Sequence, residues 1–224
     1  MTNIKVFIII LSLALFSCTS SRIVKPLNKN EKEIGLSLGG PLISFSDLVI
    51  PIPLTSLHYA HGYNDNLTLY GGLHTTSLLS GVIHTDIGIV QNIFSEDNYY
   101  FGTSINPSLH FMIDIWEGNP KLFPSIDFNL YRTYNESGNF FYFGATNWFD
   151  LVKYKAHGEL NTTKWLISPQ IGHTFMRNKW NINLEVKYLL PYISNQDIVV
   201  DYVKWTGNYG TIGIYLGFNY RFNK

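Results

Sequence analysis

Charged residues are scarce in this sequence. Its 224 residues include 16 Lys and Arg against 16 Asp and Glu, a formal net charge of zero at pH 7. Charged residues make up 14% of the chain, whereas a soluble domain carries about 25%. Without a positive field the chain cannot gather nucleic acid by charge, so no nucleic-acid partner is expected. A chain with 16% aromatic residues must stay dispersed by some means other than surface charge.

Cysteine is almost absent as well. Cys18 is the only one, which excludes an intramolecular disulfide. It follows an apolar run over 6–16 that begins after Lys5 and is too short to span a bilayer as a helix, so residues 1–17 are predicted to be a signal peptide. The end of the run, Leu-Phe-Ser-Cys, resembles the bacterial lipobox, which implies that Cys18 is lipidated. The alternative is a plain cleaved signal, which also predicts export.

Motifs that hold common cofactors are missing from the sequence. There is no Walker-type loop, dinucleotide fingerprint, CxxC pair or HExxH. The glycine-rich GLSLGGP at 35–41 falls in a predicted strand and lacks the following helix that a phosphate loop needs. The polar residues that follow Cys18 predict a lipid-anchor tether over 18–32, which leaves 33–224 as one domain.

Hydrophobic residues alternate with small or polar ones from Glu33 onward, which predicts strands rather than helices. The C-terminal segment shows the pattern most clearly, with one face formed by Ile212, Ile214, Leu216, Phe218, Tyr220 and Phe222. The same period recurs upstream and gives about ten strands. The chain is therefore expected to be all-β and antiparallel.

The connections between these strands alternate in length. Short polar joints occur at 62–66, 95–98, 135–139 and 177–179, and mostly longer ones at 42–52, 76–81, 114–121, 150–163 and 191–207. With an even strand count and strands of about ten residues, this pattern resembles the class of bacterial outer-membrane β-barrels. The resemblance implies an up-and-down transmembrane barrel over 33–224, a place in the bacterial outer membrane among its lipids, and both termini at the periplasmic end.

Apolar faces turned outward to lipid and polar faces turned inward suit such a barrel, because closure satisfies every backbone hydrogen bond within hydrocarbon. Trp148, Trp165 and Trp180 fall near predicted strand ends, as an interfacial aromatic belt would require. The alternative fold is a soluble sandwich or lipocalin-like barrel with its apolar face inside. Low charge and long apolar faces favour the membrane barrel.

Three histidines fall on the inward faces of neighbouring predicted strands. Pairing around the joints places His74 opposite His84, and His84 opposite His110. The same pairing places Asp86 and Asp127 opposite Ser108, one layer deeper. Because directly opposite residues have Cβ atoms about 4.5–5.5 Å apart, the three imidazoles are expected to form a row toward the loop end. His74, His84, His110 and Asp86 match the donors that zinc or a similar divalent ion needs.

The same residues have two other interpretations. His, Asp and Ser are ordinary fillers of a wet barrel lumen, and the row would then hold no cofactor. Asp86, Ser108 and the histidines also supply the residue types of a hydrolase or a lipid-modifying enzyme. Three further inward charges, Glu185, Lys187 and Arg221, are predicted to form ion pairs inside the barrel.

No motif of a known barrel enzyme is present, so the sequence favours a non-enzymatic outer-membrane lipoprotein. Its expected role is that of an envelope or surface-binding protein with an extracellular ligand or an envelope partner, or that of a narrow pore. A barrel enzyme and a metal-binding barrel remain the alternatives.

Overall fold

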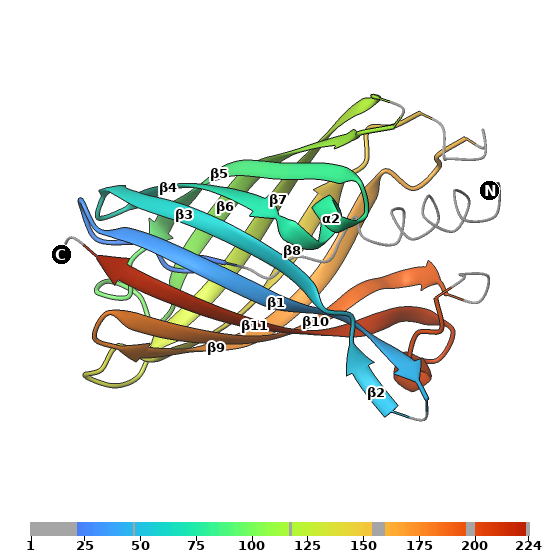
Figure 1. Ribbon diagram of the computed structural model, residues 1–224. Coiled ribbons are helices and arrows are strands. Elements are labelled where there is room, and N and C mark those ends of the chain that lie inside the picture. The colour runs from blue at the N-terminus through green and yellow to red at the C-terminus, as the bar shows by residue number, and fades with distance from the viewer. Residues whose placement is uncertain (1–21, 47, 117, 154–159, 196–199, 223–224) are drawn as a thin grey trace.

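The computed structural model describes residues 22–46, 48–116, 118–153, 160–195 and 200–222. Almost all of the regular structure is β-strand (Figure 1). The strands are β1 (Lys32–Phe45), β2 (Leu48–Pro51), β3 (Leu54–Asn64), β4 (Leu67–His74), β5 (Val82–Phe94), β6 (Gly102–Asp114), β7 (Pro120–Thr133), β8 (Phe140–Phe149), β9 (Trp165–Arg177), β10 (Trp180–Ser194) and β11 (Tyr209–Phe222). A short helix, α2 (Thr75–Leu79), follows β4, and a 3-10 turn, η1 (Lys204–Thr206), precedes β11.

Ten of these strands close into an antiparallel barrel. Each pairs with its neighbours in sequence order, and the sheet closes where β1 pairs with β11 from Lys32↔Phe222 to Pro41↔Gly213. Closure leaves no unpaired edge among these ten strands. The predicted all-β, up-and-down barrel of ten strands is confirmed.

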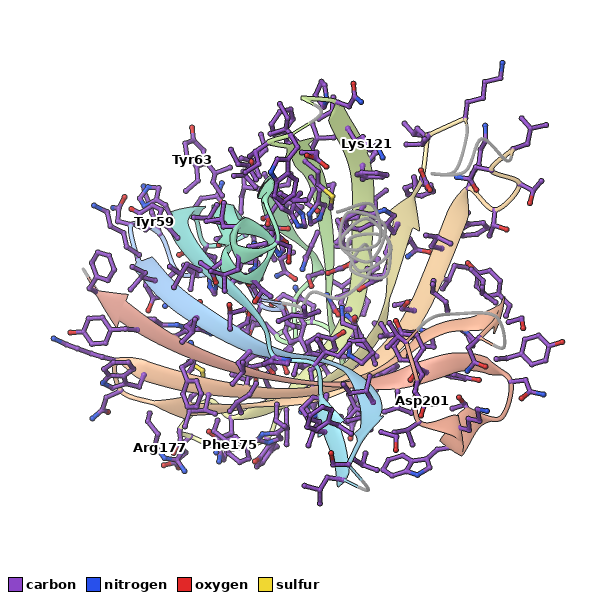
Figure 2. The ribbon with its side chains drawn as sticks, turned by 45° about the vertical axis from the view of Figure 1, so that its right-hand side comes forward. Tyr59, Tyr63, Lys121, Phe175, Arg177 and Asp201 are labelled. Atoms are coloured by element: carbon purple, nitrogen blue, oxygen red, sulfur yellow. The ribbon has the colours of Figure 1, made fainter. Side chains whose placement is uncertain are left out.

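The barrel is apolar outside and polar inside. Along β1, Ile34, Leu36 and Leu38 are 51%, 41% and 39% exposed, while Glu33 and Ser37 between them are buried. Figure 2 shows Tyr59 and Phe175 pointing outward from other strands. This is the reverse of a soluble barrel, and it is the arrangement that hydrocarbon requires. Among the described residues, the structure contains no helix long and apolar enough to cross a membrane.

The two ends of the barrel differ. One end, called the turn end below, carries the connections 65–66, 95–101, 134–139 and 178–179, together with the end of β11 at Phe222. The other, the loop end, carries α2, β2 and the connections 115–119, 150–164 and 195–208. The predicted alternation of lengths fails at 115–119, which is shorter than both 95–101 and 134–139. The connection 95–101 is long because β6 begins at Gly102 and not near Tyr99.

The segment expected to be a loop at 42–52 is largely strand. β1 continues past the barrel to Phe45 and pairs with β2 from Leu42↔Pro51 to Phe45↔Leu48. This hairpin projects away from the barrel wall at the loop end (Figure 1). It therefore extends the barrel without filling its mouth.

Strand register agrees with the sequence pairing in one place and differs in two. β4 and β5 pair as predicted, ending at Leu73↔Thr85. β5 and β6 are shifted by two residues, so that Asp86 lies opposite His110 and not opposite Ser108. β6 and β7 are shifted likewise, which places Ser108 opposite Ser125 and Asn106 opposite Asp127. A shift of two keeps every side chain on its predicted face and changes only its height in the lumen.

Residues 22–31, called the plug below, have no regular secondary structure; 22–27 lie inside the barrel, and 28–30 are exposed at the turn end. Ile23, Val24 and Leu27 are buried there. Asn106 donates to the carbonyl of Ile23 at 2.8 Å, and Ser104 donates to that of Val24 at 2.6 Å. Nearer the turn end, the backbone N–H of Leu27 donates to Thr68 Oγ1 at 2.8 Å. Part of the stretch expected to be a lipid-anchor tether over 18–32 is thus packed in the lumen, because Ile23, Val24 and Leu27 are buried there.

Candidate metal site in the barrel lumen

Three imidazoles meet inside the barrel. His74 ends β4, His84 lies near the start of β5 and His110 lies on β6, and all three are buried. One nitrogen from each ring lies within 4.8 Å of those of the other two. His74 and His84 stack with ring centroids 3.5 Å apart, and His84 Nε2 lies 3.1 Å from His110 Nδ1. The predicted row is a compact cluster.

Strand geometry explains this convergence. His74 and His84 stand one position beyond the last pair of β4 and β5, Leu73↔Thr85, so they are neighbours across the hairpin. His110 is not directly opposite His84, as the sequence pairing predicted, because Asp86 occupies that position. The contact between His84 and His110 is diagonal, and diagonal neighbours are within reach of long or aromatic side chains.

Asp86 and Arg22 border the cluster. Arg22 Nη1 donates to both carboxylate oxygens of Asp86, at 2.6 and 2.8 Å. Arg22 Nη2 lies 3.0 Å from His74 Nε2, which is also 2.8 Å from Asp86 Oδ2. The tautomer of His74 decides which of these two contacts is a hydrogen bond. The side chains of Arg22 and Asp86 are only 6% and 1% exposed, so the pair is desolvated.

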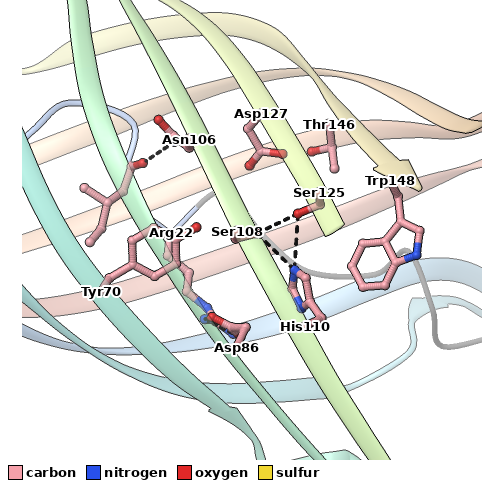
Figure 3. Close-up of a pocket in the computed structure, with 11 residues that line it drawn as sticks. Arg22, Tyr70, Asp86, Asn106, Ser108, His110, Ser125, Asp127, Thr146 and Trp148 are labelled. Atoms are coloured by element: carbon pink, nitrogen blue, oxygen red, sulfur yellow. Dashed lines mark hydrogen bonds and ion pairs between the residues drawn. The ribbon is translucent and has the colours of Figure 1, made fainter. Parts of the chain in front are cut away.

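Two serines and a tryptophan surround His110 (Figure 3). Ser108 Oγ and Ser125 Oγ lie 3.2 and 3.3 Å from His110 Nε2, and 2.6 Å from each other. The ring of Trp148 packs against His110 with centroids 4.3 Å apart. Trp148 is buried in the lumen, so its predicted place in an interfacial belt is wrong; its neighbour Phe149 ends β8, and alternation turns Trp148 inward.

The cavity beside these groups is small. It has a volume of about 30 Å³ and is lined by Arg22, Tyr70, Asp86, His110, Trp148 and their neighbours. A water molecule needs about 10–15 Å³ measured in this way, so the cavity holds one or two waters. This space does not admit an organic substrate, although Asp86, Ser108 and His110 are the residue types of acid–base and nucleophilic chemistry.

The donor set fits a divalent metal ion. Zinc takes imidazole nitrogens at about 2.0–2.1 Å, which places tetrahedral ligand nitrogens about 3.3 Å apart. The nitrogens here lie within 4.8 Å of one another, and the stacked rings of His74 and His84 would have to turn out of their stack for all three lone pairs to point at one ion. Asp86 could supply a carboxylate oxygen as a fourth ligand, but its oxygens are held by Arg22. The site thus offers two histidines that make no hydrogen bond with the plug, His84 and His110, and two groups that contact Arg22, His74 and Asp86.

The other inward charges lie apart from the histidine cluster. Lys187 Nζ lies 3.6 Å from Glu185 Oε1, and it donates to Thr146 Oγ1 at 2.9 Å. Arg221 Nε donates to Glu33 Oε2 at 2.8 Å near the turn end. Asp127 lines the same cavity, beside Thr146 (Figure 3). Cys18 and the signal peptide 1–17 lie outside the described residues.

Sequence reasoning missed Arg22, Ser125 and Trp148 at this site. Ser125 was within reach, since Ile126 and Phe128 face outward and alternation turns Ser125 inward. Arg22 gave one weak signal, the apolar pair Ile23 and Val24 that follows it in an otherwise polar stretch. Its partner Asp86 is 64 residues away in the chain, and local sequence patterns do not predict contacts between residues so far apart.

A closed antiparallel barrel with an apolar exterior and a polar lumen defines the class of this protein as a transmembrane β-barrel of the outer-membrane type. No family model matches the chain, and no curated protein matches it. Among solved structures, it is similar to the translocator domain of autotransporter NalP from Neisseria meningitidis, with a TM-score of 0.49 and 9% identity over 99% of this chain and 96% of that one.

Two other solved barrels are more distant. OprG from Pseudomonas aeruginosa has a TM-score of 0.30 and 11% identity over 90% of this chain and 100% of that one. Ail, the attachment invasion locus protein of Yersinia pestis, in complex with the heparin analogue sucrose octasulfate, has a TM-score of 0.29 and 11% identity over 87% of this chain and 99% of that one. At this level of similarity, the fold assignment rests on the strand pairing itself.

Proposed function

We propose that this protein is a closed, non-enzymatic barrel of the bacterial outer membrane that acts as an envelope or surface-binding protein through its loop end. The observation that carries the proposal is the plug. Residues 22–27 occupy the lumen between the histidine cluster and the turn end, and wall side chains fill the space around them. A filled lumen argues against the narrow pore, and a cavity of about 30 Å³ argues against an enzyme.

Planar-bilayer recording tests the closed lumen. We expect no steady conductance from the purified full-length barrel, because the plug is held by buried apolar contacts along its length. As the matched comparison, a variant that replaces Ile23, Val24 and Leu27 with Ser should show open events. Steady ion flow through the unaltered protein would contradict the proposal.

Lipidation of Cys18 belongs to the same proposal, but the lipid is now proposed at the loop end and not at the periplasmic end. The described chain runs through the lumen from Arg22 to the start of β1. The plug itself fills the lumen between Arg22 and the turn end. Because Arg22, the first described residue, lies beside the histidine cluster, we propose that a lipid on Cys18 would lie on the loop-end side, opposite to the C-terminus. The expectation that both termini lie at the periplasmic end is kept only for the C-terminus.

Epitope tags on intact cells test this arrangement. A tag inserted after Thr19 should be open to antibody on whole cells, whereas a tag after Lys224 should become accessible only after the outer membrane is permeabilised. Incorporation of radiolabelled palmitate, and its loss in Cys18→Ala, tests the lipid separately. Two tags exposed on the same side would rule out the opposed termini.

Binding of a divalent metal ion is the second candidate function, favoured by the convergence of three histidine nitrogens within 4.8 Å. Zinc content of the purified barrel, measured after incubation with zinc and removal of the excess, should fall in His84→Ala. His173→Ala is the matched control, because His173 lies on the outer face of β9, where it contacts Tyr134. Equal zinc content in all three proteins would remove this candidate.

A further inference from the structure

Arg22 is the cation that neutralises Asp86 beside the histidine cluster, and it belongs to the plug and not to the barrel wall. Its guanidinium donates twice to Asp86 and lies 3.0 Å from His74 Nε2. Asp86 and His74 are two of the four groups that a metal ion would use here. The plug therefore already occupies half of the proposed donor set.

We infer that a divalent cation and Arg22 compete for Asp86 and His74, so that metal loading at the cluster loosens the end of the plug. The inference rests on the proposed metal site. A metal ion needs an oxygen lone pair of Asp86 and an unprotonated His74 Nε2, and Arg22 places its guanidinium against both groups. Two cations so close together in a site with almost no solvent repel strongly, so the two states exclude each other.

The rest of the plug limits how far this loosening extends. Leu27 remains bonded to Thr68, and the backbone of Asn30 and Glu31 remains paired with Gly62 near the turn end. None of these contacts touches the histidines. Metal binding is thus expected to free the backbone from Arg22 to the amide of Lys25, and to leave 27–31 in place.

Competition of this kind works in both directions. If docking of Arg22 weakens metal binding, then bound metal weakens docking by the same factor, which is commonly between about 5-fold and 150-fold for coupled sites. Removing Arg22 should therefore raise the affinity for metal, and adding metal should reduce the protection of the neighbouring backbone.

Zinc titration of the full mature chain in detergent, against a chromophoric chelator, measures the first effect. Arg22→Gln should bind Zn²⁺ about tenfold or more tightly than the unaltered barrel. Lys25→Gln is the matched control, because Lys25 is also a plug cation but pairs with Glu96, near the turn end. Its affinity should stay within about twofold of the unaltered value, since it makes no contact with the cluster.

Hydrogen exchange of the unaltered protein measures the second effect and needs no substitution. Amides of residues 23–25 should exchange faster with Zn²⁺ than with a chelator, while the amide of Leu27 should not change. If the barrel and Arg22→Gln bind zinc equally, or if zinc leaves exchange at 23–25 unchanged, the competition is refuted and the metal site stands. If neither protein binds zinc, the metal site itself is refuted.

Discussion

The two halves of the lumen neutralise their buried carboxylates in different ways. Near the turn end, Glu33 on β1 accepts hydrogen bonds from Arg221 on β11 at 2.8 Å and from Asn181 on β10 at 2.9 Å. Near the loop end, Asp86 on β5 is neutralised by Arg22 of the plug. One carboxylate is held by the barrel wall itself, and the other by a segment that can move without breaking any strand pair.

This difference separates a structural ion pair from a removable one. The pair of Arg221 with Glu33 bridges the two strands at which the barrel closes, so its loss leaves a buried charge on a wall that cannot open. The pair of Arg22 with Asp86 can be lost by withdrawal of one end of the plug. Substitutions in the two halves should therefore differ in cost, and the following experiments compare them.

The largest effect is expected from Glu33→Ala. Breaking a buried ion pair costs about 3–5 kcal/mol of unfolding free energy, and we expect a value near the lower limit, about 3 kcal/mol, because solvent reaches part of Arg221. Urea unfolding followed by tryptophan fluorescence measures it, with Glu136→Ala in the exposed turn as control. A loss as small as that of Glu136→Ala would mean that the closing strands do not depend on this pair.

Asp86→Ala should cost less, about 1–2 kcal/mol, because Arg22 can leave the site with the end of the plug instead of remaining as a buried charge. The same variant should exchange faster at residues 23–25. A cost equal to that of Glu33→Ala, with exchange at 23–25 unchanged, would show that the plug is as fixed as the wall and would end the distinction between the two halves.

A double-mutant cycle between Arg22→Ala and Asp86→Ala measures the contribution of this removable ion pair to stability. Within the described part of the chain, the side-chain hydrogen bonds of Arg22 and Asp86 join them to each other and to His74, so the coupling free energy should be about 1 kcal/mol. Unfolding of the four proteins in urea gives it directly. Additive effects would mean that the contact between Arg22 and Asp86 contributes nothing to stability.

The sequence predicts the strands of the barrel wall better than the plug that lies in the lumen. Period-two alternation assigns Glu33, His74, Asp86 and Arg221 to the lumen, because a strand that faces lipid on one side permits no other placement. The predicted pairing of His84 with His110 was wrong by two residues. The start of β6 depends on the conformation of the connection 95–101, which the alternation of apolar and polar residues does not determine. The plug has neither period nor strand partner, so no sequence pattern places it.

The smallest effect concerns a second plug cation, Lys25, whose Nζ lies 3.1 Å from Glu96 Oε2 beyond the end of β5. Burial would raise the pKa of Glu96, but hydrogen bonds from the backbone and hydroxyl of Thr133 and the charge of Lys25 outweigh it and hold the pKa below its usual 4.5. Because the pKa is lowered by folding, the stabilisation is present above pH 4.5 and is lost as the pH falls through the lowered value.

Lys25 is 44% exposed, so solvent screens most of this pair, and Lys25→Ala should cost at most about 0.5 kcal/mol at neutral pH. Unfolding in urea across the acid range measures the difference between the variant and the unaltered barrel. That difference should shrink toward zero below pH 4.5. A cost at neutral pH as large as that of Asp86→Ala would show that the pair of Lys25 with Glu96 holds the plug as strongly as the pair of Arg22 with Asp86.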